Sequence, residues 1–292
     1  MSIQVYIDGK FMPKEDAKIS VFDHGFLYGD GVFEGLRIYN GQIFKFHEHL
    51  ERLYESAHHL LLKIPLTYAE MEAATLEAVR INNIRDAYIR IVVSRGVGDL
   101  GLDPIKCDVA TVIIIVDGIT LFPQELYDKG MDVITAATRQ RRHDTVEHRV
   151  KSLNYLNNIL IKLEAAQAGR LEAIALSTEG YVVEGSGSNI FILDKKGTLI
   201  TPPVYVGALE GITRNTVIDL ALEHGMKVKE SLFTRHDLYI AKECFLTGTA
   251  AELIPVISVD RRLIGDGKPG EVTKKLIDIY RNYAQNNGTK VL

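Results

Sequence analysis

The stretch Arg149-Val150-Lys151-Ser152-Leu153-Asn154-Tyr155-Leu156-Asn157-Asn158 decides how the rest of the chain is interpreted. Its apolar spacing predicts a helix over residues 152–168 that ends at Gly169, with Lys151 just before the N-cap and Tyr155 one turn inside. A lysine in that position is ordinarily a solvated surface residue. A chemical role for Lys151 therefore requires partner residues elsewhere in the chain.

The composition excludes several classes of protein. The 292 residues are 46% hydrophobic with a formal net charge of -4, which indicates a globular chain of two domains with no basic field for nucleic acid. The longest apolar run, residues 109–116, is far shorter than the ~20 residues that a membrane span needs, and the N-terminus lacks a signal pattern. Cys107 and Cys244 form no paired motif and suit a reducing compartment. We expect a cytoplasmic protein without nucleic-acid or membrane partners.

Hydrophobic periodicity predicts two domains. Residues 32–46 with Asn40-Gly41 are typical of a β-hairpin, residues 46–64 and 68–83 of helices, and residues 88–94 and 109–116 of strands. Turn and breaker residues then predict an interdomain linker over residues 118–125. The N-terminal α+β domain would span residues 1–117 and the C-terminal domain residues 126–292, with a helix over about 211–223.

Three motifs suggest other chemistry but lack the context it needs. Gly96-Val97-Gly98-Asp99-Leu100-Gly101 has the spacing of a dinucleotide fingerprint, yet no helix is predicted to open within the glycines. His47-Glu48-His49 has no second histidine at zinc-protease spacing, so we interpret these histidines as part of a solvated helix face and expect no metal. Gly185-Ser186-Gly187-Ser188 does not have nucleophile-elbow spacing.

Six separated motifs, taken together, resemble the class IV aminotransferases, the fold-type IV pyridoxal-phosphate enzymes that include branched-chain and D-amino-acid aminotransferases. In the family's order they are residues 28–37 (YGDGVFEGLR), 47–52 (HEHLER), 151–155 (KSLNY), 184–189 (EGSGSN), 209–214 (LEGITR) and 248–252 (GTAAE). The resemblance implies a two-domain α+β and α/β fold like that of D-amino-acid aminotransferase. The smaller N-terminal domain would be α+β, and the larger C-terminal domain would contain a barrel-like sheet.

The resemblance also implies a set of residues for pyridoxal 5'-phosphate. Lys151 would hold the cofactor as an imine and, as a neutral amine, move a proton between the substrate α-carbon and cofactor C4′. Glu184 matches the residue that keeps the pyridine nitrogen protonated, and Tyr155 the residue that hydrogen-bonds the phenolic oxygen. The phosphate would lie at the start of the predicted helix near residue 211, where backbone N–H groups favour an anion. The remaining cofactor-binding positions are Arg52, Leu209, Ile212, Thr213 and Thr249.

The substrate positions most resemble those of branched-chain aminotransferases. In that subfamily Tyr88 would help to hold the substrate carboxylate, Arg90 would meet the γ-carboxylate of glutamate, and the Ala250-Ala251 turn would bind the α-carboxylate. An apolar pocket would include Phe33, Tyr28 and Leu102, with the last two reaching in from the neighbouring subunit of a homodimer or larger homo-oligomer. The implied reaction is a ping-pong transfer of the amino group of Leu, Ile or Val to 2-oxoglutarate, giving 2-oxo acids and L-glutamate.

Two other enzymes of the same fold remain open as alternatives. D-amino-acid aminotransferases have an Arg-x-His pair where this chain has Arg95-Gly96-Val97, and aminodeoxychorismate lyase releases pyruvate without amino transfer. The chain has no tryptophan, so the linker-borne tryptophan of some members is absent near Phe122. The basic segment Arg139-Gln140-Arg141-Arg142-His143 is interpreted as a solvated loop that could admit acidic or larger substrates.

Overall fold

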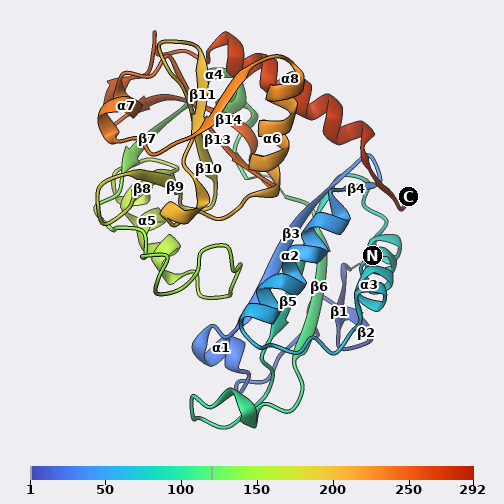
Figure 1. Ribbon diagram of the computed structural model, residues 1–292. Coiled ribbons are helices and arrows are strands. Elements are labelled where there is room, and N and C mark those ends of the chain that lie inside the picture. Colours follow the sequence, from blue (N-terminus) through green and yellow to red (C-terminus); the bar gives the residue numbers. More distant parts are fainter. Residues whose placement is uncertain (1, 120) are drawn as a thin grey trace. The chain divides into compact units, whose positions relative to one another are not determined.

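The chain forms two compact units in the computed structural model, which describes residues 2–119 and 121–292 (Figure 1). Unit 1 comprises the chain up to Ile119 together with Val150–Tyr155 and Ala284–Leu292. Unit 2 comprises the residues that lead up to Arg149 and Leu156–Tyr283. Thr120, inside the predicted linker, lies outside the described residues, and the domain boundaries at residues 118–125 remain a prediction.

Unit 1 contains a seven-stranded antiparallel sheet among its described residues. In order across the sheet the strands are β16 (Gly288–Lys290), β4 (Gln42–Phe44), β3 (Gly31–Tyr39), β5 (Ala87–Ser94), β6 (Thr111–Asp117), β1 (Gln4–Ile7) and β2 (Lys10–Pro13). The predicted hairpin is confirmed, because Asn40 and Gly41 join β3 to β4 with φ of 46° and 76°. Positive φ at both positions is what a type I′ turn requires.

Two longer helices belong to this unit, α2 (Phe46–His59) and α3 (Tyr68–Asn82), with the short α1 (His24–Tyr28) and a 3₁₀ turn η1 (Pro104–Lys106). Figure 1 shows α2 lying along the sheet, where it buries Leu50 and Leu53 in the core. The prediction that this helix reaches residue 64 was wrong, since Leu61 has a left-handed φ of 50°. That conformation stops an α-helix.

The segment around Lys151 is not helical, contrary to the prediction. Its helix, α5 (Leu156–Gln167), begins after Tyr155. Before it, the Phe33 N–H donates to the Lys151 carbonyl at 3.0 Å, and the Leu153 N–H donates to the Gly31 carbonyl at 2.9 Å. These bonds to β3 satisfy backbone groups that the helix would have used, so tertiary pairing overrides the local helical pattern.

Unit 2 is built on a larger mixed sheet. In order its strands are β12 (Lys227–Glu230), β11 (Thr198–Thr201), β10 (Asn189–Leu193), β13 (Glu243–Gly248), β14 (Glu252–Val259), β7 (Met131–Thr135), β8 (Ala173–Leu176) and β9 (Val182–Gly185), with β15 (Arg262–Leu263) paired to β14. Asn189 of β10, the third strand from one edge, donates to Glu184 of β9, the strand at the opposite edge, at 3.3 Å. The sheet therefore curls back on itself, which confirms the barrel-like arrangement.

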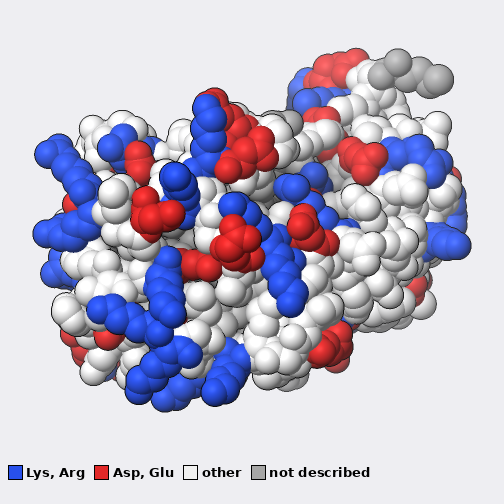
Figure 2. Space-filling model, turned by 90° about the horizontal axis from the view of Figure 1, so that it is seen from above, with Lys and Arg blue, Asp and Glu red and all other residues white. Residues whose placement is uncertain are grey.

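The other helices of unit 2 are α4 (Gln124–Lys129), α6 (Ile212–Glu223), α7 (Arg235–Tyr239), α8 (Glu271–Asn286) and the 3₁₀ turn η2 (Val204–Val206). The helix expected over residues 211–223 is confirmed, with Gly211 as its N-cap. None of the described helices is both long and apolar enough to cross a membrane. On the face shown in Figure 2, Lys and Arg side chains are interspersed with Asp and Glu.

Candidate active site

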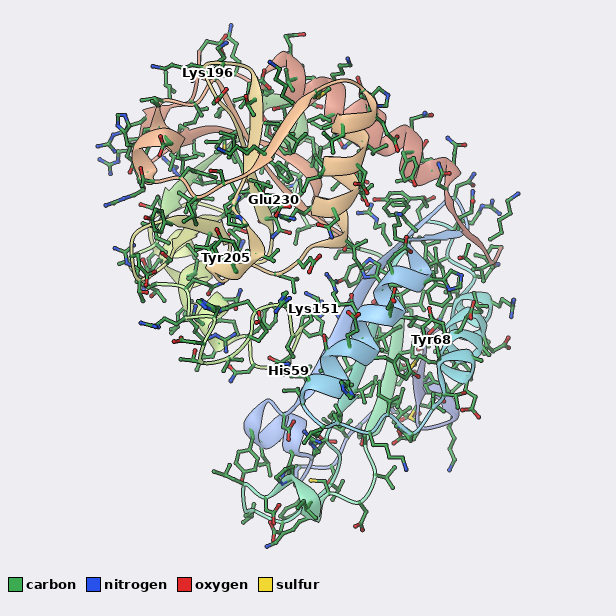
Figure 3. All side chains as sticks on the ribbon, in the orientation of Figure 1. His59, Tyr68, Lys151, Lys196, Tyr205 and Glu230 are labelled. Atoms are coloured by element: carbon green, nitrogen blue, oxygen red, sulfur yellow. The ribbon has the colours of Figure 1, made fainter. Side chains whose placement is uncertain are left out.

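Lys151 lies in a cluster of aromatic residues within unit 1. Its Nζ donates to the Tyr155 hydroxyl at 3.0 Å and lies 4.4 Å from the centre of the Phe33 ring. The Phe33 and Tyr155 rings meet edge to face, 5.0 Å apart. The Lys151 backbone N–H donates to Ser56 Oγ of α2 at 3.2 Å, and Figure 3 shows Lys151 beside that helix. Hydrogen bonds therefore position Lys151 both at its backbone N–H and at its side-chain amine.

Tyr88 and Arg90 of β5 lie in the same group. The Arg90 guanidinium is 4.6 Å from the Phe33 ring centre and its Nη2 donates to the Tyr88 hydroxyl at 3.4 Å. Gly35 pairs with Arg90 across β3 and β5, and a Cβ built on Gly35 would lie 1.7 Å from the Tyr88 hydroxyl. The tyrosine hydroxyl can occupy its position only because residue 35 has no side chain. Sequence reasoning did not single out Gly35, although glycine within a buried strand commonly marks such a close approach.

A buried ion pair holds Arg52 of α2. Arg52 donates from Nε to Glu34 Oε1 at 2.7 Å and from Nη2 to Glu34 Oε2 at 3.0 Å, and His49 Nδ1 donates to the same Oε2 at 2.7 Å. Burial opposes ionisation of Glu34, but the charge of Arg52 and the His49 hydrogen bond outweigh it and hold the carboxyl pKa well below its usual range. For His49 burial dominates and lowers the imidazole pKa.

The interpretation of residues 47–49 as a solvated histidine face was wrong for His49, which is buried, and right for His47, which is exposed. Glu34 was missed as well. Two signals could have indicated the cluster: Glu34 interrupts a continuous apolar strand, and His49 and Arg52 are three residues apart on one helix face. The described residues hold no group of three or more His, Cys, Asp or Glu side chains able to bind a metal ion.

The structure does not bring Tyr28 and Leu102 into the group of aromatic residues around Lys151. Tyr28 ends α1, where its hydroxyl donates to the Leu100 carbonyl at 2.5 Å, and Leu102 follows in the same loop. The side chain of Leu102 is 78% exposed. No helix opens within the glycines of residues 96–101, because β6 follows the loop after the 3₁₀ turn η1. This segment therefore does not have the loop-to-helix geometry that a dinucleotide fingerprint needs.

Arg95, the residue that kept the D-amino-acid enzyme open, is engaged elsewhere. Its guanidinium pairs with Asp30 at 2.8 and 3.0 Å and donates to the carbonyls of Leu60 and Leu61, each at 2.9 Å. These bonds hold the loop after β5 to the end of α2. They use the guanidinium for structure rather than for a substrate carboxylate.

In unit 2, Glu184 has a network of uncharged donors. Oε1 accepts from Gln140 Nε2 at 2.9 Å, and Oε2 accepts from the Leu209 N–H at 3.0 Å and from Asn189 Nδ2 at 3.3 Å. Gln140 belongs to the basic segment interpreted as a solvated loop. That interpretation was wrong for Gln140, whose side chain is buried, although Arg139, Arg142 and His143 are exposed.

The start of α6 lies beside this network. Gly211 packs so closely on Asn189 that a Cβ at residue 211 would lie 2.0 Å from the Asn189 Oδ1 atom. Gly211 has no side chain to cap the helix. The backbone N–H groups of the first turn, which include those of Ile212 and Thr213, are therefore suited to bind an anion. Leu209 is two residues before the cap and already bonds Glu184.

Thr249, Ala250 and Ala251 form the turn between β13 and β14 at the same edge of the sheet. Thr247, two residues before Thr249, pairs with Asn189 of β10. The buried hydroxyls of Ser188 and Thr247 have no hydrogen-bond partner among the described residues. Buried polar atoms are ordinarily satisfied, so this edge has the donors to receive a polar group such as a phosphate ester. The residues present in unit 2 therefore fit pyridoxal phosphate, because Glu184 offers a carboxylate that could accept from a ring N–H, and the start of α6 offers N–H groups that could bind a phosphate.

Comparison with known proteins agrees with this geometry. The model of the family "Amino-transferase class IV" matches residues 31–259. A branched-chain-amino-acid aminotransferase of Pseudomonas aeruginosa is 41% identical over 281 residues, covering 94% of this chain and 91% of the relative.

Two solved structures have the same fold. The crystal structure of the Escherichia coli branched-chain amino acid aminotransferase has a TM-score of 0.94 at 34% identity, covering 97% of this chain and 95% of that one. The branched-chain amino acid aminotransferase of Thermobaculum terrenum, solved in its PLP form, has a TM-score of 0.88 at 33% identity, covering 97% of this chain and 94% of that one. The predicted fold type is confirmed, and the chain belongs to the class IV aminotransferase family.

Proposed function

We infer that the protein is a pyridoxal-phosphate-dependent aminotransferase that moves the amino group of L-leucine, L-isoleucine or L-valine to 2-oxoglutarate. The observation that carries this conclusion is the group of Lys151, Tyr155, Phe33, Tyr88 and Arg90 in a chain whose relatives are branched-chain enzymes. A site that accepts both an apolar and a carboxylate side chain requires an apolar surface and a cation. The Phe33 ring and Arg90 supply these beside the Lys151 amine.

Pyridoxal phosphate, when bound, supplies an electron-accepting ring that stabilises negative charge at the substrate α-carbon. Lys151 would hold the cofactor and then act as the base that takes the α-proton and returns it at C4′. Tyr155, whose hydroxyl receives a hydrogen bond from the lysine amine, would also donate to the phenolic oxygen. Glu184 would accept the ring N–H, and hydrogen bonds from Gln140 Nε2 and the Leu209 N–H hold its two oxygens in place.

The phosphate would be held by charge and by backbone N–H groups. Arg52 is fixed in direction by Glu34, and its guanidinium would add charge-assisted hydrogen bonds. The start of α6 would contribute the N–H groups of Ile212 and Thr213, with the hydroxyls of Thr213 and Thr249. Leu209 would support the ring side of the cofactor through its bond to Glu184.

Substrate recognition would be divided between an apolar surface and a single cation. Phe33 offers an apolar ring to a branched side chain, and Arg90, whose guanidinium lies over that ring, would pair with the γ-carboxylate of glutamate. Tyr88 and the N–H groups of the Ala250-Ala251 turn would hold the α-carboxylate. One pocket would then accept both substrates of the ping-pong cycle.

We also propose a homodimer or larger homo-oligomer in the cytoplasm. Tyr28 and Leu102 belong to an exposed apolar part of unit 1 that includes Phe26 and Leu100, each with 68% of its surface exposed. Apolar patches of this kind ordinarily mark an interaction surface. Tyr28 and Leu102 would complete the pocket of the neighbouring subunit.

The deciding experiment is a set of half-reactions. The yellow holoenzyme is mixed separately with L-leucine, L-glutamate and D-alanine, and the loss of cofactor absorbance is followed. We expect L-leucine and L-glutamate to react and D-alanine not to react. Reaction with D-alanine alone would indicate the D-amino-acid enzyme, and pyruvate release from aminodeoxychorismate would indicate the lyase.

A further inference from the structure

Gln140 has an unusual environment for a residue in a basic surface loop. Its neighbours Arg139 and Arg142 are exposed, but its own side chain is only 1% exposed. The Gln140 backbone N–H donates to the Leu176 carbonyl at 2.9 Å, which fixes the loop to the end of β8. A long polar side chain that is buried in this way needs partners for both ends of its amide.

Both ends of the amide have partners, and together they give the amide one orientation. Asn157 Nδ2 donates to Gln140 Oε1 at 2.8 Å, which leaves Nε2 to donate to Glu184 Oε1 at 2.9 Å. Asn157 belongs to α5, and Glu184 to β9. Gln140 therefore connects the helix after Lys151 to the carboxylate expected to face the ring nitrogen.

The proposed effect of Gln140 on Glu184 depends on the amide side chain of Gln140 carrying no charge. A cation at residue 140 would pair with Glu184 and weaken the attraction of its carboxylate for a protonated ring nitrogen. An acid at residue 140 would oppose ionisation of Glu184 by like-charge repulsion. An amide donor instead orients the carboxylate without adding a charge of its own beside it.

We propose that Gln140 is a positioning residue that acts through Glu184 to favour the protonated pyridine nitrogen. This inference rests on the proposed function, because it requires Glu184 to face the ring nitrogen of pyridoxal phosphate. Gln140 itself does not touch the cofactor in this proposal. It sets the direction of the carboxylate that does.

The test compares two cofactors that differ only at the ring nitrogen. Apoenzyme is titrated with pyridoxal phosphate and with its carbocyclic analogue, which has C–H in place of that nitrogen, and binding is followed by quenching of tyrosine fluorescence. Wild-type protein should prefer pyridoxal phosphate. In Gln140→Leu the preference should fall about tenfold, the effect of one hydrogen bond to a charged group, with affinity for the analogue unchanged.

If the role of Gln140 is purely structural, Gln140→Leu should lower the affinity for both cofactors equally or leave both affinities unchanged. Either result would overturn the inference while leaving the proposed function intact. A wild-type protein without any preference would overturn the inference and the assignment of Glu184 to the ring nitrogen, whereas the half-reactions test the proposed transamination separately. Gln124→Leu is the matched control, because Gln124 is an exposed glutamine that also donates to a carboxylate, at 3.3 Å to Asp128. It should keep the wild-type preference.

A second variant covers the case in which Gln140→Leu fails to fold. In Gln140→Glu the new acid, when protonated, can still donate to Glu184 as the amide does, and when ionised it repels that carboxylate. The preference for pyridoxal phosphate should therefore be present at low pH and decline as pH rises. A preference independent of pH in this variant would contradict the proposal.

Discussion

Glu34 receives two hydrogen bonds from Arg52, at 2.7 and 3.0 Å, in a place where the carboxylate is entirely shielded from solvent. A paired guanidinium has a fixed plane, so Glu34 determines the direction in which Arg52 can present its charge. The side chain of Arg52 keeps 11% of its surface exposed. We interpret the pair as the support for the phosphate site.

Glu34→Ala should lower both stability and cofactor affinity. Removing one partner of a buried ion pair leaves the other charge uncompensated, which typically costs about 3–5 kcal/mol. Urea unfolding of the apoprotein measures the first effect, and titration with pyridoxal phosphate measures the second. The double variant Glu34→Ala/Arg52→Ala is the control, and strictly additive losses in the thermodynamic cycle would show that the two residues do not act as a pair.

His49→Asn should make stability less dependent on pH. The folded-state pKa of His49 is lowered by burial, so the unfolded chain takes up a proton first as pH falls, and the native state loses stability below the ordinary histidine pKa. Asparagine can still donate to Glu34 but cannot be protonated. Unfolding free energies measured between pH 7 and 5 should fall less steeply in the variant than in wild type.

The lowered pKa of Glu34 acts in the same direction at more acid pH. Its contribution to stability is present above the ordinary glutamate pKa and is lost as pH falls below it. His49→Asn should therefore retain the acid loss below about pH 4.5. A variant with the full wild-type slope between pH 7 and 5 would contradict the assignment to His49.

Lys151→Ala should abolish turnover and leave the fold intact. Lys151 is bonded through its own backbone to β3 and α2, and those bonds do not depend on its side chain. The variant should still bind pyridoxal phosphate reversibly, with an unfolding transition close to that of wild type. Lys196→Ala, on the surface of unit 2 (Figure 3), should be fully active. Transamination at the wild-type rate by Lys151→Ala would remove the central claim.

Sequence patterns correctly predicted the elements whose conformation is determined by residues close together in the chain. The Asn40-Gly41 hairpin and α6 formed as expected, because turn residues and helical spacing are properties of residues close together in the sequence. The segment before α5 did not, since its backbone pairs with β3, far away in sequence. The resemblance implied that Lys151 and Phe33 belong to one site, and in the structure the Lys151 Nζ atom lies 4.4 Å from the centre of the Phe33 ring.

Buried polar residues were the main failure of sequence reasoning. His49 and Gln140 were both interpreted as solvated, because each lies among charged neighbours. Their burial depends on partners from other elements, Glu34 for the first and Glu184 for the second. No pattern within its own segment indicates the burial of Gln140, whereas the spacing of His49 and Arg52 on one helix face could have indicated that of His49.

Gly35→Ala should impair substrate binding without affecting the phosphate site. The added methyl group would lie 1.7 Å from the Tyr88 hydroxyl, so the tyrosine must move away from Arg90. We expect kcat/KM for L-leucine to fall on the order of tenfold or more, since small displacements of positioning groups are costly. Affinity for pyridoxal phosphate should be unchanged, and a loss of that affinity would mean that the strand itself is disturbed.

Arg90→Ala should separate the two substrates. The Arg90 guanidinium lies over the Phe33 ring, so it can pair with a γ-carboxylate at the edge of an otherwise apolar surface. A hydrogen-bonded charge pair is worth roughly 1.5–3 kcal/mol, which corresponds to a loss of about ten- to a hundredfold in kcat/KM for L-glutamate. The value for L-leucine should change only a few fold. Arg80→Ala, an exposed arginine of α3, is the control, and equal losses for both substrates in Arg90→Ala would reject the assignment, because a residue that recognises the γ-carboxylate cannot matter equally to a substrate that lacks one.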